Sequence, residues 1–301
     1  KRERIPCALT IAGSDSGGGA GIQADLKVFA SFGVHGTSAI TCLTAQNPAG
    51  VYGIQACTPE MVRAQINAVT SGLKPHAAKT GMLYSGDIIR VVRDWRESAA
   101  DRTAFVVDPV MVATSGARLL KPAAVTSLLK LLPLASLVMP NLQEAEIISE
   151  MEIKDPEIYA LRAEDFETYG CAALVKGGHL QGLRDAVDVF YNGAEELLLT
   201  APFVRGVSTH GTGCTYSAAV TAALALGMPL ARAVGTAKEY ISRAIAQSQQ
   251  QPDTRSLLLP SLSGGLLQRL QAILSPLAGF LDSGSFEHCS KRFLAIGFGQ
   301  S

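Results

Sequence analysis

The feature that most constrains the fold of this 301-residue chain is a regular alternation of short apolar runs with segments of helical periodicity. The apolar runs end in Gly, Asp, Pro or Asn, which is typical of buried parallel strands that are each followed by a crossover helix. The pattern predicts strands at residues 7–12, 38–44, 77–80, 105–107, 137–139 and 172–175. It predicts helices at residues 22–32, 59–72, 87–98, 122–131, 144–151 and 163–169. Six alternations favour an α/β fold with a mostly parallel central sheet.

The pattern changes after the sixth strand. Residues 187–191 and 197–202 flank Asn192-Gly193, a pair typical of β-hairpin turns, so we expect antiparallel strands on one edge of the sheet. Two further helices are predicted at residues 215–226 and 230–246.

A change of composition at Gln247 predicts a domain boundary. We divide the chain into a domain of residues 1–250 and a tail of residues 251–301. Leucines at helical spacing between residues 266 and 281 predict a short helix in the tail, interrupted by Pro276. The tail either docks on a surface or is irregular, and its role is unknown.

Composition excludes several classes of partner. The 26 Lys and Arg residues balance 26 Asp and Glu residues, so we expect no binding of nucleic acid. The longest stretches without charge, 28–59 and 206–231, contain no run of about 20 apolar positions, so we expect no membrane span. Six widely spaced cysteines, with no Cys-x-x-Cys pair and no secretory signal ahead of Ile5, indicate reduced thiols in a cytoplasmic protein.

A glycine-rich loop follows the first predicted strand. The segment Gly13-Ser-Asp-Ser-Gly-Gly-Gly-Ala-Gly-Ile-Gln-Ala-Asp25 has five glycines and leads directly into a helix. It lacks the Gly-Lys-Ser/Thr end of a Walker A loop, and it lacks the acidic residue about 20 positions on that completes a dinucleotide-binding fingerprint. Either its backbone approaches a ligand closely, or it is a flexible connection between strand and helix.

A second glycine loop, Thr209-His-Gly-Thr-Gly-Cys-Thr215, immediately precedes an Ala-rich helix. Its glycines let successive backbone N–H groups point at one spot, and the helix N-terminus adds partial positive charge. This predicts an anion site that stabilises a phosphoryl group during transfer, with close packing of the helix start as the alternative. Cys214 is expected to have a lowered pKa and to accept a proton from an attacking hydroxyl. His210 is more typical of a hydrogen bond within the loop.

Charged residues at the ends of predicted strands suggest a metal and phosphate site. Asp108, Asn141 and Glu144 follow two of the strands, and Mg²⁺ prefers a few oxygen ligands together with phosphate. Lys176 ends another strand, where it can bind a phosphate as a point charge. The alternatives are a turn carboxylate for Asp108, a first-turn helix charge for Glu144 and a solvated lysine at position 176.

Seven motifs in a fixed order carry a family resemblance, at residues 13–27, 44–47, 79–82, 107–111, 140–144, 175–179 and 210–215. Their order and spacing closely resemble the hydroxymethylpyrimidine/phosphomethylpyrimidine kinases of thiamine biosynthesis. The resemblance implies a ribokinase-like three-layer α/β/α fold with an antiparallel edge hairpin. It also implies two successive ATP-dependent phosphorylations, first of 4-amino-5-hydroxymethyl-2-methylpyrimidine and then of its monophosphate. Residues 252–301 match nothing in the family.

The resemblance also implies the roles of individual residues. The pyrimidine pocket would be lined by Gly13, Asp25, Gln46, Met82 and Val110. Gln46 offers both a donor and an acceptor to an aminopyrimidine edge, and Met82 can pack on the ring face. ATP would be bound by Asn141, Glu144, Lys176, Thr209 and Lys238, and Mg²⁺ by Asp108 and Glu144. Gly211, Gly213, Cys214 and Lys176 would act on the transferring phosphoryl group.

Two other functions are considered. A pyridoxal kinase shares the fold, but such enzymes commonly place an Asp where this chain has Cys214. A catalytically silent ligand-binding protein is the alternative from another class, and the intact lysine, carboxylate and glycine-loop motifs argue against it. The expected partners are the small-molecule pyrimidine and a second copy of the chain, in a homodimer.

Overall fold

The computed structural model describes residues 5–99, 103–113, 116, 118–151, 163, 165–177, 185–204 and 210–248. The chain divides into two units, Lys1–Leu259 and Pro260–Ser301, and every described residue belongs to the first. Thr209 and the tail of residues 251–301 lie outside the described residues. The predicted domain boundary at residue 250 therefore stays a prediction.

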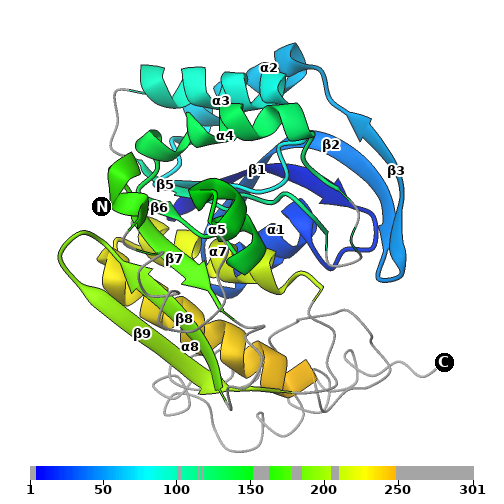
Figure 1. Cartoon of the computed structure of the whole chain (residues 1–301). Coiled ribbons are helices and arrows are strands. Elements are labelled where there is room, and N and C mark those ends of the chain that lie inside the picture. Colours follow the sequence, from blue (N-terminus) through cyan, green and yellow to red (C-terminus); the bar gives the residue numbers. More distant parts are fainter. Residues whose placement is uncertain are drawn as a thin grey trace, which may run out of the picture. The chain divides into compact units, whose positions relative to one another are not determined.

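A nine-stranded sheet runs through the described part of the chain in the order β3-β2-β1-β4-β5-β6-β7-β8-β9 (Figure 1). Its strands are β1 (Cys7–Asp15), β2 (His35–Asn47), β3 (Gly50–Ala56), β4 (Ala77–Thr80), β5 (Ala104–Val107), β6 (Leu137–Val138), β7 (Ala172–Lys176), β8 (Asp185–Tyr191) and β9 (Glu196–Pro202). Strands β1, β2 and β4 to β7 pair in parallel, as the alternation predicted. Their carboxyl ends therefore meet at one edge, where ligands of open α/β sheets bind.

Antiparallel strands lie at both ends of the sheet. The predicted β8–β9 hairpin is confirmed, and its turn is held by the Asn192 side chain, which accepts N–H bonds from Ala194 and Glu195. The structure adds a second antiparallel pair that the sequence did not indicate, because β3 pairs antiparallel with β2 at the other edge. Most side chains of β3 are exposed or half-buried, so its sequence lacks the apolar signal of a strand.

The helices are α1 (Gly21–Ser31), α2 (Pro59–Leu73), α3 (Gly86–Ser98), α4 (Val125–Leu129), α5 (Leu142–Ser149), α7 (Thr212–Ala225) and α8 (Leu230–Ser248). Thr58 and Ser85 cap α2 and α3 by accepting the N–H groups of Met61 and Ile88. The predicted helix at 122–131 is divided into a 3-10 turn (Pro122–Ala124) and α4, and a second 3-10 turn (Leu132–Leu134) follows; α4 cannot continue past Pro133, which has no N–H to donate. At 163–169, the structure has a 3-10 turn over Phe166–Tyr169.

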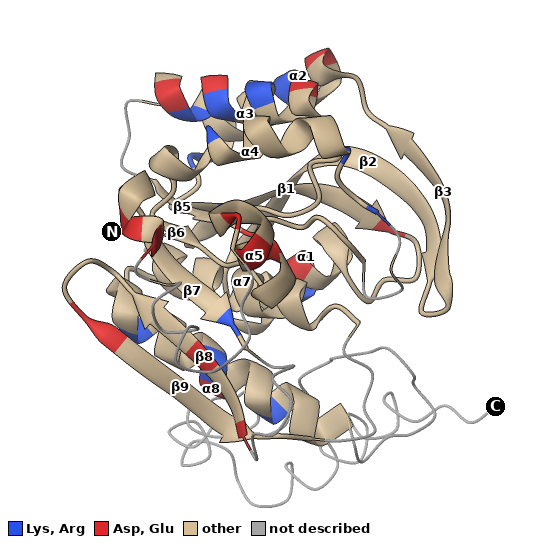
Figure 2. Ribbon diagram, viewed as in Figure 1, with Lys and Arg blue, Asp and Glu red and all other residues tan. Residues whose placement is uncertain are grey.

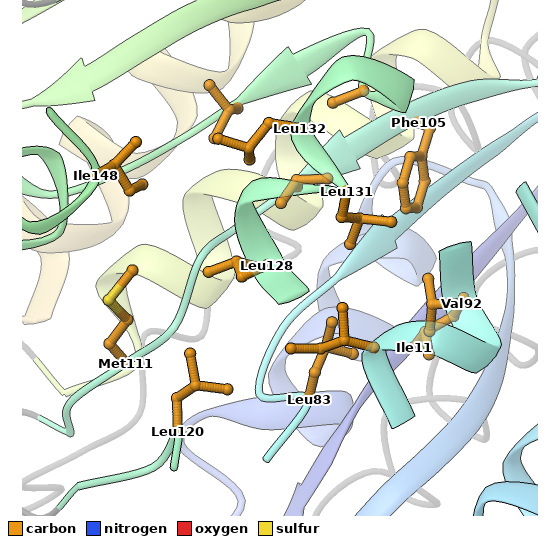
Figure 3. Close-up of a cluster of buried hydrophobic side chains, with 14 of the residues drawn as sticks. Ile11, Leu83, Val92, Phe105, Met111, Leu120, Leu128, Leu131, Leu132 and Ile148 are labelled. Carbon is orange, nitrogen blue, oxygen red and sulfur yellow. The ribbon is translucent and has the colours of Figure 1, made fainter. Parts of the chain in front are cut away.

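The helices form one layer on each face of the sheet. Alternate strand residues such as Ile11 and Phe105 pack with α2 to α5, and Figure 3 shows part of this cluster. The neighbouring positions, such as Ala8 and Val106, pack with α1, α7 and α8. This alternation produces the three-layer α/β/α arrangement that was expected.

The outer surfaces of α2 and α3 carry interspersed acidic and basic residues (Figure 2). Arg63 and Asp94 form an exposed ion pair of 3.2 Å between these helices. Among the described residues, no helix is both long enough and apolar enough to span a membrane.

Helix α7 packs against α1, α8 and strands β4 and β5, so small side chains are required on nearly all of its sides. Ala222 is fully buried there, whereas Ala246 is exposed on α8. We predict that Ala222→Leu lowers the free energy of unfolding by about 1–3 kcal/mol, because a packed interior accommodates extra methylenes poorly. The control Ala246→Leu should stay within about 0.5 kcal/mol of the parent chain. Urea unfolding followed by circular dichroism measures both, and equal effects would contradict the packing of α7.

Candidate active site

A buried carboxylate lies at the end of β5. Asp108 is 2% exposed; its Oδ1 accepts from Lys176 Nζ at 2.9 Å, and its Oδ2 accepts from Ser217 Oγ at 2.8 Å. Burial opposes ionisation of this carboxyl, but the ammonium groups of Lys176 and Lys79 together hold its pKa below the usual range. Asp108 is therefore negatively charged, and it is held in place by Lys176 of β7 and Ser217 of α7.

The second glycine loop begins α7 next to Lys176. Gly211 is the N-cap with a φ of 80°, and a Cβ there would lie 1.8 Å from the carbonyl oxygen of Gly19, so only glycine fits. A Cβ on Gly213 would lie 3.5 Å from Lys176 Nζ. In the described part of the chain, the buried Thr212 hydroxyl of this first turn has no hydrogen-bond partner. A helix N-terminus and an ammonium group thus lie together, as an anion site requires.

Cys214 follows in the same turn. The expectation of a lowered pKa is wrong, because burial of the thiol raises its pKa to about 11. Lys79 and the backbone N–H of Gly21 act in the opposite direction but do not outweigh burial. Sequence position at a helix N-terminus did not reveal how much protein surrounds the sulfur. The thiol is protonated in the ligand-free protein at neutral pH.

Glu144 and Asn141 form the start of α5. The Asn141 side chain accepts from the N–H of Glu144 at 2.9 Å, and Glu144 Oε2 accepts from the N–H of Asn141 at 2.9 Å, which makes a capping box. Glu144 Oε1 also accepts from the N–H of Met111. Burial raises the pKa of Glu144 to about 7 against the attraction of Lys176. The carboxyl is thus both a helix cap and a near-neutral acid beside the phosphate site.

Lys79 and Asp25 form an ion pair beneath the site. Lys79 Nζ lies 2.7 Å from Asp25 Oδ1, both side chains are fully buried, and Thr10 donates to Asp25 Oδ2 at 2.6 Å. Burial alone would lower the pKa of Lys79, but the Asp25 carboxylate raises it; the pKa of Asp25 is itself raised by burial, against the attraction of Lys79. Asp25 was expected in the pyrimidine pocket; in this structure it is directed at Lys79, and contact with a substrate stays a prediction.

The other expected pyrimidine residues gather at the ends of β1, β2, β4 and β5. Met82 and Val110 belong to a small apolar cluster around Cys42, and a Cβ on Gly13 would lie 2.8 Å from the Cys42 sulfur. Gln46 is half-buried, and its backbone N–H binds the hydroxyl of Ser16 in the first glycine loop. The side chains of Met82 and Val110 thus contribute an apolar surface, and Gln46 contributes an amide group.

Lys238 is placed on α8 at some remove from the cluster around Asp108. Its Nζ contacts Asp188 Oδ2 at 2.7 Å, and Asp188 Oδ1 accepts the N–H of Gly177 at 3.0 Å. Lys238 therefore holds Asp188, which in turn binds the backbone of Gly177, the residue after Lys176. Direct contact of Lys238 with a nucleotide stays a prediction.

Four contributors to the site had been assigned no role from the sequence: Asp15, Lys79, Asp188 and Ser217. Lys79 was detectable, because a lysine within a predicted buried strand requires a buried counter-charge. The other three are polar residues at the end of β1, in β8 and in α7, positions where such residues are common, so no local pattern marks them. Among the described residues, no three His, Cys, Asp or Glu side chains are arranged to hold a metal by themselves.

Comparison with known sequences identifies relatives over most of the chain. The profile of the phosphomethylpyrimidine kinase family matches residues 15–256. The hydroxymethylpyrimidine/phosphomethylpyrimidine kinase of Rhizobium meliloti is 47% identical over 246 residues, which cover 81% of this chain and 91% of the relative. The enzyme of the same name from Bacillus subtilis is 43% identical, over 79% of this chain and 88% of the relative.

Solved structures show the same architecture. Phosphomethylpyrimidine kinase from Clostridium difficile 630 superposes with a TM-score of 0.71 at 40% identity and covers 80% of this chain and 100% of that one. An ADP complex of Bacillus subtilis pyridoxal kinase gives a TM-score of 0.74 at 38% identity, over 80% and 92% of the two chains.

The buried Lys79–Asp25 pair leads to a stability prediction. Lys79→Met should lower the free energy of unfolding by about 3–5 kcal/mol, because it leaves the Asp25 carboxylate buried without a counter-charge. The double variant Asp25→Asn, Lys79→Met should be less destabilised than the sum of its single variants. Arg63→Met, in the exposed pair with Asp94, is the control and should change stability by less than about 1 kcal/mol. A urea-unfolding double-mutant cycle tests this, and additive effects at positions 25 and 79 would refute the coupling.

Proposed function

Because this chain belongs to the phosphomethylpyrimidine kinase family, we propose how its residues divide the work of two phosphoryl transfers. The enzyme phosphorylates the hydroxymethyl group of 4-amino-5-hydroxymethyl-2-methylpyrimidine with ATP and then phosphorylates the monophosphate, in thiamine biosynthesis. The observation that carries the assignment of roles is the proximity of Lys176 to the N-terminus of α7 at the carboxyl ends of the parallel strands.

Lys176 and the first turn of α7 stabilise the transferring phosphoryl group. Phosphoryl transfer spreads negative charge over the equatorial oxygens, and fixed donors lower the barrier without reorganising. Gly213 leaves room beside Lys176 Nζ, so the phosphoryl group and the ammonium group can approach the same backbone turn. Gly211 sets the direction of that turn through its positive φ.

Asp108 and Glu144 suit a Mg²⁺ that ATP brings with it. Both carboxyls are buried at the phosphate site, and each oxygen keeps a lone pair beyond its present hydrogen bond. Mg²⁺ typically takes one or two protein carboxylates and completes its shell with water and phosphate, so two residues suffice. When bound, the ion neutralises charge on the ATP phosphates. Asn141 holds Glu144 in place through the capping box.

The pyrimidine ring lies against Met82 and Val110, and Gln46 pairs with its amino edge; Gly13 lets Cys42 and Met82 pack closely behind the ring. Support comes from the apolar cluster that these side chains form around Cys42. Pyridoxal, a similar ring with a hydroxymethyl group, is proposed as a poorer substrate because it lacks the aminopyrimidine edge that Gln46 can pair with.

We also propose a homodimer in the cytoplasm. Leu43 and Tyr52 on β2 and β3 are 51% and 69% exposed, and β3 is an edge strand, which together favour association with a second copy. Cys7, Cys42, Cys57, Cys171 and Cys214 are free thiols, which is consistent with a reducing compartment.

Substrate preference tests the pyrimidine pocket. ADP release should be measured with hydroxymethylpyrimidine, its monophosphate and pyridoxal in parallel, and we expect turnover with both pyrimidines. Gln46→Leu should weaken pyrimidine binding by about 1–3 kcal/mol, because buried polar atoms of the ring lose their partner. Binding of ATP by this variant is the internal control. Turnover with pyridoxal alone would overturn the assignment, and unchanged pyrimidine affinity would remove Gln46 from the pocket.

The pH dependence of the rate tests Cys214 as the proton acceptor. With a pKa of about 11, the reactive thiolate fraction grows with pH throughout the range 7–9, so the single-turnover rate at saturating ATP should rise with pH. Cys214→Ala should be slower by about 10²- to 10⁴-fold and should lose this rise. Any pH dependence that Glu144 contributes is common to the parent and this variant, so the ratio of the two rates isolates the contribution of Cys214.

Cys171→Ala is the matched control for that experiment. The Cys171 thiol also has a pKa of about 11, but it precedes β7 at the opposite end of the strand from Lys176. This variant should keep the pH dependence of the parent enzyme. A parent rate that is flat between pH 7 and 9 would exclude Cys214 as a base.

A further inference from the structure

The first glycine loop is folded around its own carboxylate. Asp15 Oδ1 accepts the N–H of Gly17 at 2.8 Å, and its Oδ2 accepts the N–H groups of Gly19 and Ala20 at 3.1 and 2.8 Å. The N–H of Gly18 binds the carbonyl oxygen of Asp15 at 2.9 Å. Backbone nests of this kind hold phosphate in other proteins. Here the N–H groups of residues 17–20 are all engaged, so this loop is not the phosphate site.

The same carboxylate reaches the second glycine loop. His210 Nε2 lies 3.2 Å from Asp15 Oδ2, although the residues are 195 positions apart in the chain. Asp15 is buried, and its hydrogen bonds with His210, Gly17 and Ala20 lower its pKa against the effect of burial. One ionised group therefore holds both loops.

Two further contacts bring the loops together. The carbonyl oxygen of Gly19 occupies the space where a side chain on Gly211 would begin, at 1.8 Å from the position of its Cβ. The backbone N–H of Gly21, at the start of α1, is close enough to the sulfur of Cys214 to act against the rise of its pKa. Since Gly211 and Cys214 belong to the turn that begins α7, a shift of the first loop moves the surroundings of Cys214 and of the anion site.

We propose that Asp15 and His210 are positioning residues for phosphoryl transfer, which hold the first glycine loop against the loop of residues 210–214. They touch no reacting atom; they fix the distance between the Cys214 sulfur, the N–H of Gly21 and the first turn of α7. This inference rests on the proposed role of residues 211–214. Gly19 is the glycine of the first loop that lies against the second loop, whereas Gly17 and Gly21 pack within the first loop and against β2.

The test compares His210→Leu with His210→Gln in the full chain. Leucine removes the donor to Asp15, whereas the glutamine amide can replace the imidazole N–H. We expect His210→Leu to lower kcat by about 10- to 100-fold, as small misplacements of catalytic groups do, and to leave KM for the pyrimidine and ATP largely unchanged. His210→Gln should recover most of kcat. Lys27→Met is the control, because Lys27 binds the carbonyl oxygen of Gly18 from the exposed side of the loop; its kcat should stay near that of the parent.

A second readout needs no substrate. Amide hydrogen exchange at residues 17–20 should become faster in His210→Leu and stay near the parent rate in His210→Gln, although the changed residue is in the other loop. A parent enzyme without pyrimidine turnover would refute the proposed function. Unchanged amide exchange at residues 17–20 in His210→Leu would refute the contact between Asp15 and His210 that joins the two loops. Equal kcat in the leucine variant and the parent, equal loss in both His210 variants, or a change confined to KM would each overturn the positioning role.

Discussion

The site depends on the mutual compensation of buried charges along one edge of the sheet. Asp25, Lys79, Asp108, Lys176 and Glu144 form a row in which carboxylates and ammonium groups alternate and each acts electrostatically on the next. A single charge of this kind would be expelled from the interior or neutralised, so the members are interdependent. The row lies where parallel strands end, and the direction of the strands therefore determines where the chemistry can occur.

Most of the fold follows from periodicity. The parallel strands and the helices between them were predictable because strands covered on both faces are continuously apolar and the helices have one apolar face. Strand β3 was not predictable, because it is an edge strand. Backbone pairing with β2 holds it in the sheet, and few of its side chains are buried. Its sequence, with two glycines, resembles that of a loop. Backbone hydrogen bonding at a sheet edge leaves little trace in the side chains.

The site could be predicted from the sequence only in part. Lys176, Asp108 and Gly213 follow predicted strands or begin a predicted helix, and the structure brings them together as expected. The thiol of Cys214 was misjudged, because helix position is a local property and burial is not. Ser217, which donates to Asp108, could not be recognised, because a serine inside a helix acquires its partner only when the helix docks on the sheet.

The environment of Cys214 has a consequence for resistance to oxidants. Peroxides attack thiolates, and the reaction leads from sulfenic acid to irreversible sulfinic and sulfonic acids. Because the pKa of Cys214 is raised to about 11, the thiolate is the minor form at pH 7 in the ligand-free enzyme. A cysteine enzyme that keeps its sulfur activated at rest is exposed to oxidative inactivation throughout its lifetime. In this protein the resting sulfur is protected chemically, and a peroxide burst should spare Cys214 while it damages enzymes with acidic thiols.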